Sequence, residues 1–462
     1  MIGGYSRAWS CLPLLAALGV AACAPAKKPP PVEAKVFAPA AWRATDQADG
    51  VVSATWWQAF NDPQLSALVE QALQHNTDVL TAISRVEEAR QQIQLSRSAL
   101  FPTVDLSVGG QTTRELGVTG ITHTRSVQPE LQVSYEADLW GRLRTLEQAA
   151  RLQYQATQAD RDNVRLSIAS TTAQAYITLL SLDTQLQVTR DTEKSRLGAL
   201  AVAKDRAESG YTSQLELTQA QSEYESAAQM VPQTEQAIRQ QENALALLTG
   251  QLPGYIARDH GLETLKPPVV PGSLPSTLLR RRPDIQQAEH LVAASDLNLE
   301  ARRDDYLPQV QLSAGIGRLY VNALNYDPIK VWDLGLSVLA PIFTGGQLEA
   351  QVNVATAERD QAAYAYRATV LNAFSEVETA LSGVTRLEQQ IVWVRARINT
   401  LRRSLEIATD RYQGGYSSYL EELDAQRNLF DSELAAIQVR ETQLNNIVAL
   451  YQALGGGWAP TP

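Results

Sequence analysis

The chain has 462 residues and a formal net charge of −10, which allows two or three domains but argues against nucleic acid as a partner, since phosphate binding needs clustered Lys and Arg. Charged residues make up 19% and aromatic residues 6% of it, and Ala and Gln are abundant in long Pro-poor stretches, a bias toward long helices. The two cysteines, Cys11 and Cys23, both lie near the N-terminus, so the body can hold neither a disulfide framework nor a zinc site.

The N-terminus is typical of an export signal, with Arg7 as its positive end and an apolar stretch over residues 12–22. Residues 20–23, Val-Ala-Ala-Cys, resemble the bacterial lipobox, in which the cysteine becomes the acylated first residue of the mature chain. We interpret residues 1–22 as a signal peptide and Cys23 as the lipidation site. An ordinary signal peptide with a chance cysteine is the alternative.

A lipidated N-terminal tether is expected over residues 23–55, in which Pro29-Pro30-Pro31 favours a semi-rigid extended chain. Residue 24 is Ala rather than Asp, which by resemblance to lipoprotein sorting favours the outer membrane and its lipid over the inner membrane.

The body of the chain is an internal duplication. Residues 76–79 and 100–102 recur, shifted by 206, at 282–285 and 306–308, and several short motifs within residues 205–221 recur, shifted by 205, within residues 410–426. Because this register holds along nearly the whole half, chance is a poor explanation. We therefore divide the body into a first repeat at 56–255, a linker at 256–275, a second repeat at 276–458 and a tail at 459–462.

Each repeat is predicted to contain a helix, a pair of strands, a very long helix, a turn and another long helix. Alternating apolar residues predict the strands, and apolar residues spaced by three and four predict coiled-coil seams on the helices. The strands are expected at about 103–117 and 125–139, and at about 309–321 and 332–342. The long helices are expected at about 142–209 and 212–249, and at about 347–413 and 416–454.

Four strands per chain raise the question of how their edges are paired. Their length suits the ~25 Å apolar band of an outer-membrane barrel, but four strands cannot close one and an open edge is not tolerated in lipid. The predicted fold class is therefore mainly α with a small β part. Several chains would each donate a ribbon, and a homotrimer with four strands per chain would give a 12-stranded outer-membrane β-barrel. A soluble trimeric scaffold with a β-sandwich is the alternative.

Several short motifs, taken together and in order, are specific. They are Trp56-Trp57-Gln58-Ala59-Phe60-Asn61-Asp62-Pro63, Leu279-Arg280-Arg281-Arg282-Pro283-Asp284-Ile285, Leu423-Asp424-Ala425-Gln426 and Ala453-Leu454-Gly455-Gly456-Gly457-Trp458. With them the sequence resembles the TolC-like outer-membrane efflux factor family, in the lipoprotein branch that serves resistance-nodulation-division (RND) pumps. The resemblance implies a homotrimeric exit channel of a tripartite efflux system, whose β-barrel is continuous with a long periplasmic α-helical barrel of coiled-coil-like helices. It also implies that the linker at 256–275 lies in an equatorial region. The partners of the channel would be a periplasmic membrane-fusion adaptor protein and an inner-membrane RND-type pump.

The turns between the long helices carry the same pattern in both repeats: Arg206, Gly210 and Leu215, and then Arg411, Gly415 and Leu420. A glycine in the left-handed conformation ends a helix, and a Ser or Thr just beyond it caps the next one. By resemblance, the same turns form the periplasmic tip at which adaptor hairpins dock.

Two acids beyond the second turn, Glu421 and Asp424, lie three apart on one helical face. By resemblance they occupy the positions of acidic rings at the closed periplasmic end, where such rings attract cations. Solvated surface acids are the alternative. Tyr412 resembles the gate tyrosine of the family, whereas Ser417 stands where some members carry a gating Arg. The first repeat has Gln219 at the position of Asp424, so one repeat alone would supply that ring.

Catalysis finds little support, so neither an enzyme nor a cofactor or metal site is predicted. No phosphate loop or nucleophile motif is present, and the four histidines lack metal-ligand spacing: His75, His123, His260 and His290. Two other functions stay open at this point. One is the same channel used for protein or peptide secretion, and the other is a non-conducting structural lipoprotein that spans the periplasm.

Overall fold

The computed structural model describes residues 26–39, 41–43, 53–117, 120–258, 260–268, 275–322 and 328–457. The expected signal peptide at 1–22, the lipidation site Cys23, Trp458 and the whole tail at 459–462 lie outside these ranges. The chain separates into two compact units. The sheet unit comprises Met1–Lys35, Arg85–Gln158 and Gln287–Ala368, and the tip unit comprises Val36–Ser84, Ala159–Gln286 and Thr369–Pro462.

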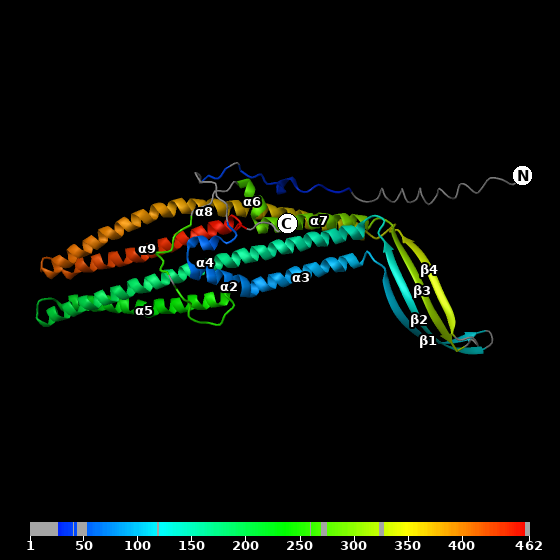
Figure 1. Cartoon of the computed structure of the whole chain (residues 1–462), viewed down its shortest axis with the longest axis horizontal. Helices are drawn as coiled ribbons and strands as arrows, with labels where there is room; N and C mark the ends of the chain where they lie inside the picture. Colours follow the sequence, from blue (N-terminus) through cyan, green and yellow to red (C-terminus); the bar gives the residue numbers. More distant parts are fainter. Residues whose placement is uncertain are drawn as a thin grey trace. The chain divides into compact units, whose positions relative to one another are not determined.

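The duplication is visible in the order of the elements along the chain (Figure 1). The first repeat contains η3 (Trp56–Phe60), α2 (Pro63–His75), α3 (Thr77–Ser98), β1 (Thr103–Gly117), β2 (Gly120–Ala137), α4 (Arg142–Glu208) and α5 (Gln214–Leu248). The second contains α6 (Pro275–Arg281), α7 (Pro283–Asp304), β3 (Gln309–Val321), β4 (Ile329–Leu339), α8 (Gln347–Gln413) and α9 (Tyr419–Ala453). A short turn, η2 (Val32–Ala34), precedes both repeats.

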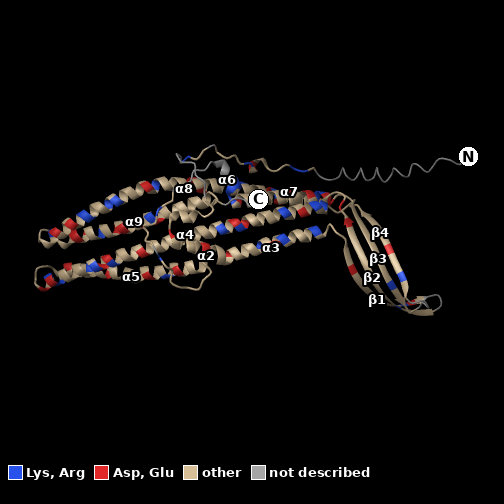
Figure 2. Cartoon of the chain, viewed as in Figure 1, with Lys and Arg blue, Asp and Glu red and all other residues tan. Residues whose placement is uncertain are grey.

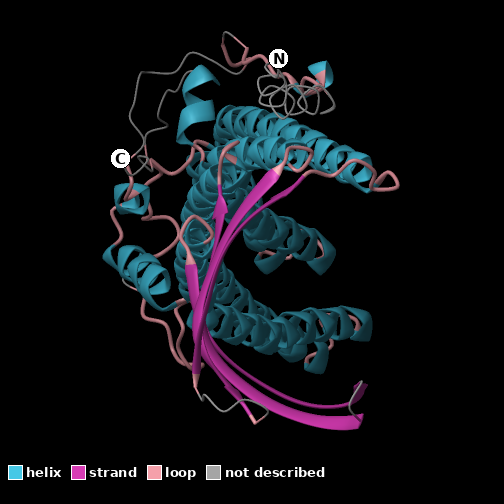
Figure 3. Cartoon of the chain, turned by 90° about the vertical axis from the view of Figure 1, so that its right-hand side faces the viewer, coloured by secondary structure: helices cyan, strands magenta, loops and turns pink. Residues whose placement is uncertain are grey.

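The sheet unit holds one antiparallel sheet, drawn in magenta in Figure 3. Its strands lie in the order β1-β2-β3-β4. Its register places apolar residues opposite one another across all four strands, as in the row Leu106, Leu131, Ile316 and Trp332. Residues one position along face the other side, where Gln132, Gly315 and Asp333 form a polar row. The apolar face is exposed in the single chain. Its exposed large members are Val104, Leu106, Val108, Val127, Leu131, Leu312, Ile316, Trp332, Leu334, Leu336 and Val338.

Strand β2 differs from its expected bounds because it begins at Gly120, where a loop reaching to residue 124 was predicted. The residues concerned are rich in threonine, a good strand former, and they pair with β1 up to the contact of Gly117 with Gly120. Gly120 has a φ of +116°, a conformation that glycine adopts readily. In this region, the alternation of apolar and polar residues predicted the strands correctly, whereas the turn-forming residues wrongly predicted a longer loop.

Helices α4 and α8 each contain 67 residues, and α5 and α9 each contain 35. The two long helices contain no proline, which would remove a hydrogen bond and disturb the preceding turn, whereas α5 carries Pro232 inside it. Within the described residues, no helix combines the length and the apolar character needed to cross a membrane.

Each repeat opens with two helices separated at an equivalent position, Asn76 in the first and Arg282 in the second. The Asn76 side chain accepts hydrogen bonds from the backbone N–H groups of Asp78 and Val79 at 2.9 and 3.3 Å and so begins α3. Arg282 is buried and donates to Asp284, to Glu376 at 2.6 Å and to the backbone oxygen of Ala453 at 3.0 Å. Arg282, the last arginine of the run, thus lies at a helix junction and is paired with carboxylates.

Candidate gate and docking tip

The candidate site lies in the tip unit, where α4 turns into α5 and α8 turns into α9. Both turns use the same hydrogen bonds: Tyr211 N–H donates to the Arg206 oxygen, and Tyr416 N–H donates to the Arg411 oxygen, each at 2.8 Å. Gly210 and Gly415 have φ values of +73° and +75°, the left-handed conformation that ends a helix at low cost only for glycine. The predicted turn geometry is confirmed in both repeats.

A serine follows each turn at the N-cap position of the next helix, but only one of the two serines caps its helix with its side chain. Ser213 is the N-cap of α5, and its hydroxyl accepts a hydrogen bond from Glu216 N–H at 3.3 Å. Ser418 occupies the same position before α9 but makes no such side-chain hydrogen bond. The predicted serine cap is therefore confirmed for the first repeat alone.

A cluster of buried side chains joins all four helices just behind the turns. It comprises Ala203 of α4, Ala220 of α5, Tyr412 of α8, and Tyr419 and Leu423 of α9. The rings of Tyr412 and Tyr419 are 5.5 Å apart and tilted, a favourable arrangement for aromatic pairs. Burial raises the pKa of Tyr419 to about 12, and the carboxylate of Glu422 adds to the effect. Tyr419 therefore stays neutral at physiological pH.

Tyr412 is the centre of a polar network within this cluster. Its hydroxyl donates to the carboxylate of Glu216, which also accepts a hydrogen bond from the hydroxyl of Thr212. The Arg206 guanidinium lies 4.4 Å from the centroid of the Tyr412 ring, and it reaches the backbone oxygens of Tyr412 and Gln413 at 3.5 and 3.4 Å. Burial, followed by the hydrogen bond to Glu216, raises the pKa of Tyr412 strongly.

The two arginines of the repeated pattern have different surroundings. Arg206 folds back onto the second hairpin through Tyr412, as described above. Arg411 is exposed, and its Nη2 lies 3.7 Å from the Glu421 carboxylate, which is also exposed. The structure therefore brings Arg206 and Tyr412 together, and it places Arg411 with Glu421 instead.

The acidic residues beyond the second turn fall on two faces of α9. Asp424 is exposed and accepts a hydrogen bond from the Asn428 side chain at 3.1 Å, and Glu421 is exposed as well. Glu422 is buried, and it accepts hydrogen bonds from Thr409 at 3.1 Å and from Gln426 at 3.2 Å. Burial raises the pKa of Glu422 against the effect of these two donors.

An ionic contact also joins the two hairpins, further from the turns. Glu223 of α5 is buried, and it pairs with Arg196 of α4 at 3.1 Å and with Arg427 of α9. The Arg196 guanidinium also lies 5.5 Å from the ring centroid of Phe430. Breaking a buried pair leaves an uncompensated charge, so this contact holds α9 against the first hairpin.

The outer surface of the two turns is apolar in places and mixed in charge. Tyr211 and Leu215 in the first turn are 86% and 66% exposed, and their equivalents Tyr416 and Leu420 are 82% and 57% exposed. Figure 2 shows that acidic and basic residues lie around the same turns. Large apolar side chains exposed together on helix turns are typical of a protein contact surface.

Sequence reasoning missed three members of this site: Glu216, Glu422 and Glu223. Glu216 had a detectable signal, because Leu215-Glu216 is repeated as Leu420-Glu421. Its partner Tyr412 has no equivalent in the first repeat, which has Ala207 there, so the duplication could not show that the two meet. No group of residues that could hold a metal is found in the described part of the chain.

Comparison with known proteins identifies the class to which this fold belongs. The chain matches the family model of outer membrane efflux proteins over residues 68–251 and 274–456. It therefore belongs to the outer membrane efflux protein family. As a member of this family, it is a trimeric outer-membrane channel that works with a periplasmic adaptor and an inner-membrane RND pump, and it is not an enzyme. The resemblance and fold class expected from the sequence are confirmed.

Particular relatives span nearly the whole chain. The pyoverdine export outer membrane protein OpmQ of Pseudomonas aeruginosa is 30% identical over 442 residues, with 93% of each chain covered. The probable efflux pump outer membrane protein TtgC of Pseudomonas putida is 32% identical, with 90% of this chain and 88% of the relative covered. Among solved structures, the outer-membrane channel OprN matches with a TM-score of 0.85 and 26% identity, over 94% of this chain and 99% of the other.

Proposed function

We propose that this channel conducts small molecules, that it is anchored by lipid at Cys23, and that the tip unit holds both its gate and its adaptor-docking surface. The observation that carries the gate is the network of Arg206, Tyr412 and Glu216. It ties the end of α8 to both helices of the first hairpin. An opening that separates the two hairpins has to break these contacts, so they stabilise the closed state.

The exposed acids Glu421 and Asp424 supply cation selectivity in this proposal. Three copies of each carboxylate around a trimer axis attract cations and repel anions. Supporting this, neither side chain is buried. Asp424 accepts a hydrogen bond from Asn428 and lies near Arg427, and Glu421 lies 3.7 Å from the exposed Arg411.

Conductance in planar bilayers tests the gate and the ring together. Purified trimers should give small, cation-preferring currents, and Asp424→Ala with Glu421→Ala should reduce the preference for cations. Asp431→Ala, which removes an exposed charge about two turns beyond Asp424 along α9, is the matched control. A complete absence of current in the wild type and in the variants would favour a non-conducting structural lipoprotein.

Small-molecule cargo is supported by the names of relatives, which describe pyoverdine export by OpmQ and the efflux of antibiotic, toluene or cations by others. These are cargoes of those proteins. Dye accumulation tests the proposal in cells that lack their own channel. A fluorescent dye should accumulate less in cells that carry this chain with its adaptor and pump than in cells without them. Secretion of a protein without any change in dye accumulation would point to the secretion alternative.

The docking surface consists of Tyr211, Leu215, Tyr416 and Leu420, together with the turn residues predicted from the sequence. Cysteines at Ser209 and Gln413 suit crosslinking, because both positions are exposed. A cysteine at Gly414 is less suitable, since its Cβ would lie 2.9 Å from the Tyr416 ring. Crosslinks to a co-expressed adaptor are expected at both turns and not at a cysteine placed on the polar face of the sheet, such as Ser337.

Lipid anchoring at Cys23 rests on the sequence pattern around that residue. Labelled palmitate should enter the wild-type chain and not Cys23→Ser, while the variant still folds. Persistent labelling of Cys23→Ser would refute the assignment.

A further inference from the structure

A completely buried guanidinium in the sheet unit is bound to the start of the described chain. Arg359 of α8 is 0% exposed. Its Nη1 donates to the backbone oxygen of Lys28 at 3.0 Å, its Nη2 donates to that of Pro29 at 3.3 Å, and its Nε donates to the Asp360 carboxylate at 2.8 Å. The carboxylate of Asp296 on α7 lies 3.6 Å from Nη1. Burial of a charge is costly unless it is paired and hydrogen-bonded, and this one is both.

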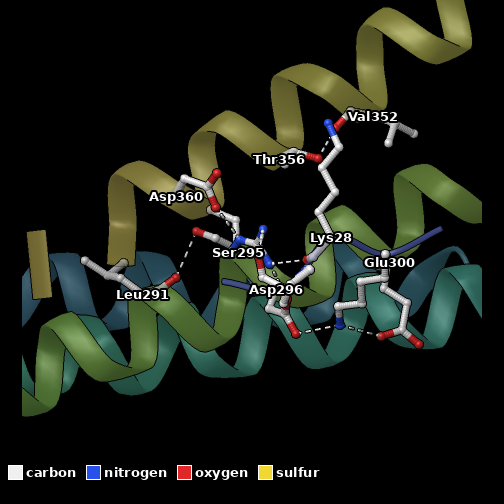
Figure 4. A network of polar contacts seen from close by, with 11 residues as sticks. Lys28, Leu291, Ser295, Asp296, Glu300, Val352, Thr356 and Asp360 are labelled. Carbon is white, nitrogen blue, oxygen red and sulfur yellow. Dashed lines mark hydrogen bonds and ion pairs between the residues drawn. The ribbon is translucent and has the colours of Figure 1, made fainter. Parts of the chain in front are cut away.

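The side chains of the two lysines in this segment approach different helices. Lys27 Nζ is 2.7 Å from Asp296 and 3.8 Å from Glu300, both on α7. The Lys28 side chain points instead along α8, toward Thr356 and Val352 (Figure 4). Glu300 and Val352 lie near the ends of α7 and α8 that adjoin strands β3 and β4. Read backward from Pro29, the segment therefore runs toward the sheet end of these helices.

The chemistry of the segment explains why an arginine holds it. Pro29, Pro30 and Pro31 carry carbonyl oxygens but no backbone N–H groups, so this stretch can accept hydrogen bonds and cannot donate them. Arginine is its complement, because a guanidinium has five N–H donors and no acceptor. Two of these donors are used on successive carbonyl oxygens of the segment, at Lys28 and Pro29.

We propose that Arg359, supported by Asp296 and Glu300, is a positioning residue that fastens residues 27–29 and so fixes where the start of the chain leaves the body. Cys23 precedes Lys27 by four residues, which span at most ~14 Å when extended. Glu300 precedes the end of α7 by four residues, which is ~6 Å of helix. The clamp therefore keeps Cys23 within reach of the sheet end of the helices. This consequence for anchoring rests on the proposed lipidation, whereas the clamp itself does not.

Limited trypsin digestion of the full-length protein in detergent tests the clamp. Trypsin can cut after Lys27 and after Lys35, but not after Lys28, which precedes proline. In Arg359→Ala, cleavage at these two sites is expected to be about tenfold faster or more, because charge-assisted hydrogen bonds to the segment are lost. Cleavage elsewhere in the chain should keep its wild-type rate. Arg359→Lys should restore part of the protection, since a lysine offers donors without the planar fork.

Arg367→Ala, about two turns further along the same helix, is the matched control and should leave both cleavage rates unchanged. If Arg359→Ala does not fold, residues 28–31 are replaced by Gly and Ser with Arg359 retained, and faster cleavage after Lys35 is again expected. Equal cleavage rates in the wild type and in every variant that folds would overturn the proposal. Palmitate labelling of Arg359→Ala separates the clamp from the proposed lipidation of Cys23. The label should still enter this variant if Cys23 is acylated, and it should be absent if the lipid assignment is wrong.

Discussion

Tyr412 is held by contacts from three other helices at once. Arg206 of α4 lies over its ring, Glu216 of α5 accepts a hydrogen bond from its hydroxyl, and Tyr419 of α9 packs against it. The strongly raised pKa of Tyr412 follows from this burial and from the adjacent carboxylate. A neutral phenol that donates to a carboxylate makes a strong hydrogen bond away from bulk water. In the proposed gate, this one hydroxyl would therefore carry much of the contact between the hairpins.

Tyr412→Phe should weaken the closed state, because it removes the hydroxyl and leaves the Glu216 carboxylate without that donor. We expect more frequent openings in planar bilayers at an unchanged preference for cations. Tyr416→Phe, on an exposed ring four residues away, should behave like the wild type. Identical currents from Tyr412→Phe and the wild type would remove this hydroxyl from the gate.

Glu422 should make the tip more stable as the pH falls. Burial raises its folded pKa above the ordinary glutamate value of 4.5, even though Arg206 and two hydrogen-bond donors oppose the rise and Glu216 adds to it. The folded state therefore holds the proton more tightly than the unfolded state. Stability should increase as the pH falls through the folded pKa toward 4.5. Because Glu422→Gln mimics the protonated side chain, it should raise the melting temperature at pH 7.

Thermal unfolding followed by circular dichroism between pH 8 and pH 4 checks this sign. The wild type should gain more stability on acidification than Glu422→Gln does. The exposed neighbour Glu421 provides the matched control, since Glu421→Gln should keep the wild-type slope. A wild-type slope in Glu422→Gln would show that other carboxylates set the pH response.

At the scale of elements, the repeated pattern predicted the helices, the strands and the turn glycines from local rules. Proline-free apolar periodicity is enough to specify a helix as long as α8, and alternation is enough to specify β3. The contacts between elements were harder to predict, because they depend on residues that the duplication does not repeat. Tyr412 and the buried Arg359 are of this kind. Their partners lie 196 and 331 residues away in the chain, and no local pattern connects them.

The contribution of a turn glycine to stability can be tested by comparing it with a glycine inside a helix. Gly415 has a φ of +75°, and no atom beyond its chain neighbours lies within 4 Å of an added Cβ. Gly415→Ala should therefore lower stability by about 1–2 kcal/mol through backbone strain alone. Gly198 in α4 also has open space around it but lacks a positive φ, so Gly198→Ala should raise stability by up to about 1 kcal/mol. Thermal unfolding of both variants measures the difference, and equal effects would rule out the strain.

At the scale of the whole molecule, the sheet of a single chain has unpaired edge strands and an uncovered apolar face. β1 and β4 are the outer strands of the sheet in the described chain, and one face of the sheet exposes a continuous set of apolar side chains. An unpaired strand edge and an exposed apolar face of this kind are unfavourable in water. Assembly of three chains in an outer membrane resolves both, because it pairs the edges and covers the apolar face with lipid.

Leu334→Arg tests that assignment of faces. Leu334 lies on the apolar face, in the register of Ala314, and an arginine facing lipid near the middle of the membrane costs about 2–4 kcal/mol. We expect less heat-resistant trimer in outer-membrane fractions. Ser337→Arg puts the same charge on the polar face of the same strand, opposite Gln311, where water or polar groups can solvate it. If both substitutions reduced the trimer equally, neither face could be assigned to lipid, and the arginine itself would be the cause.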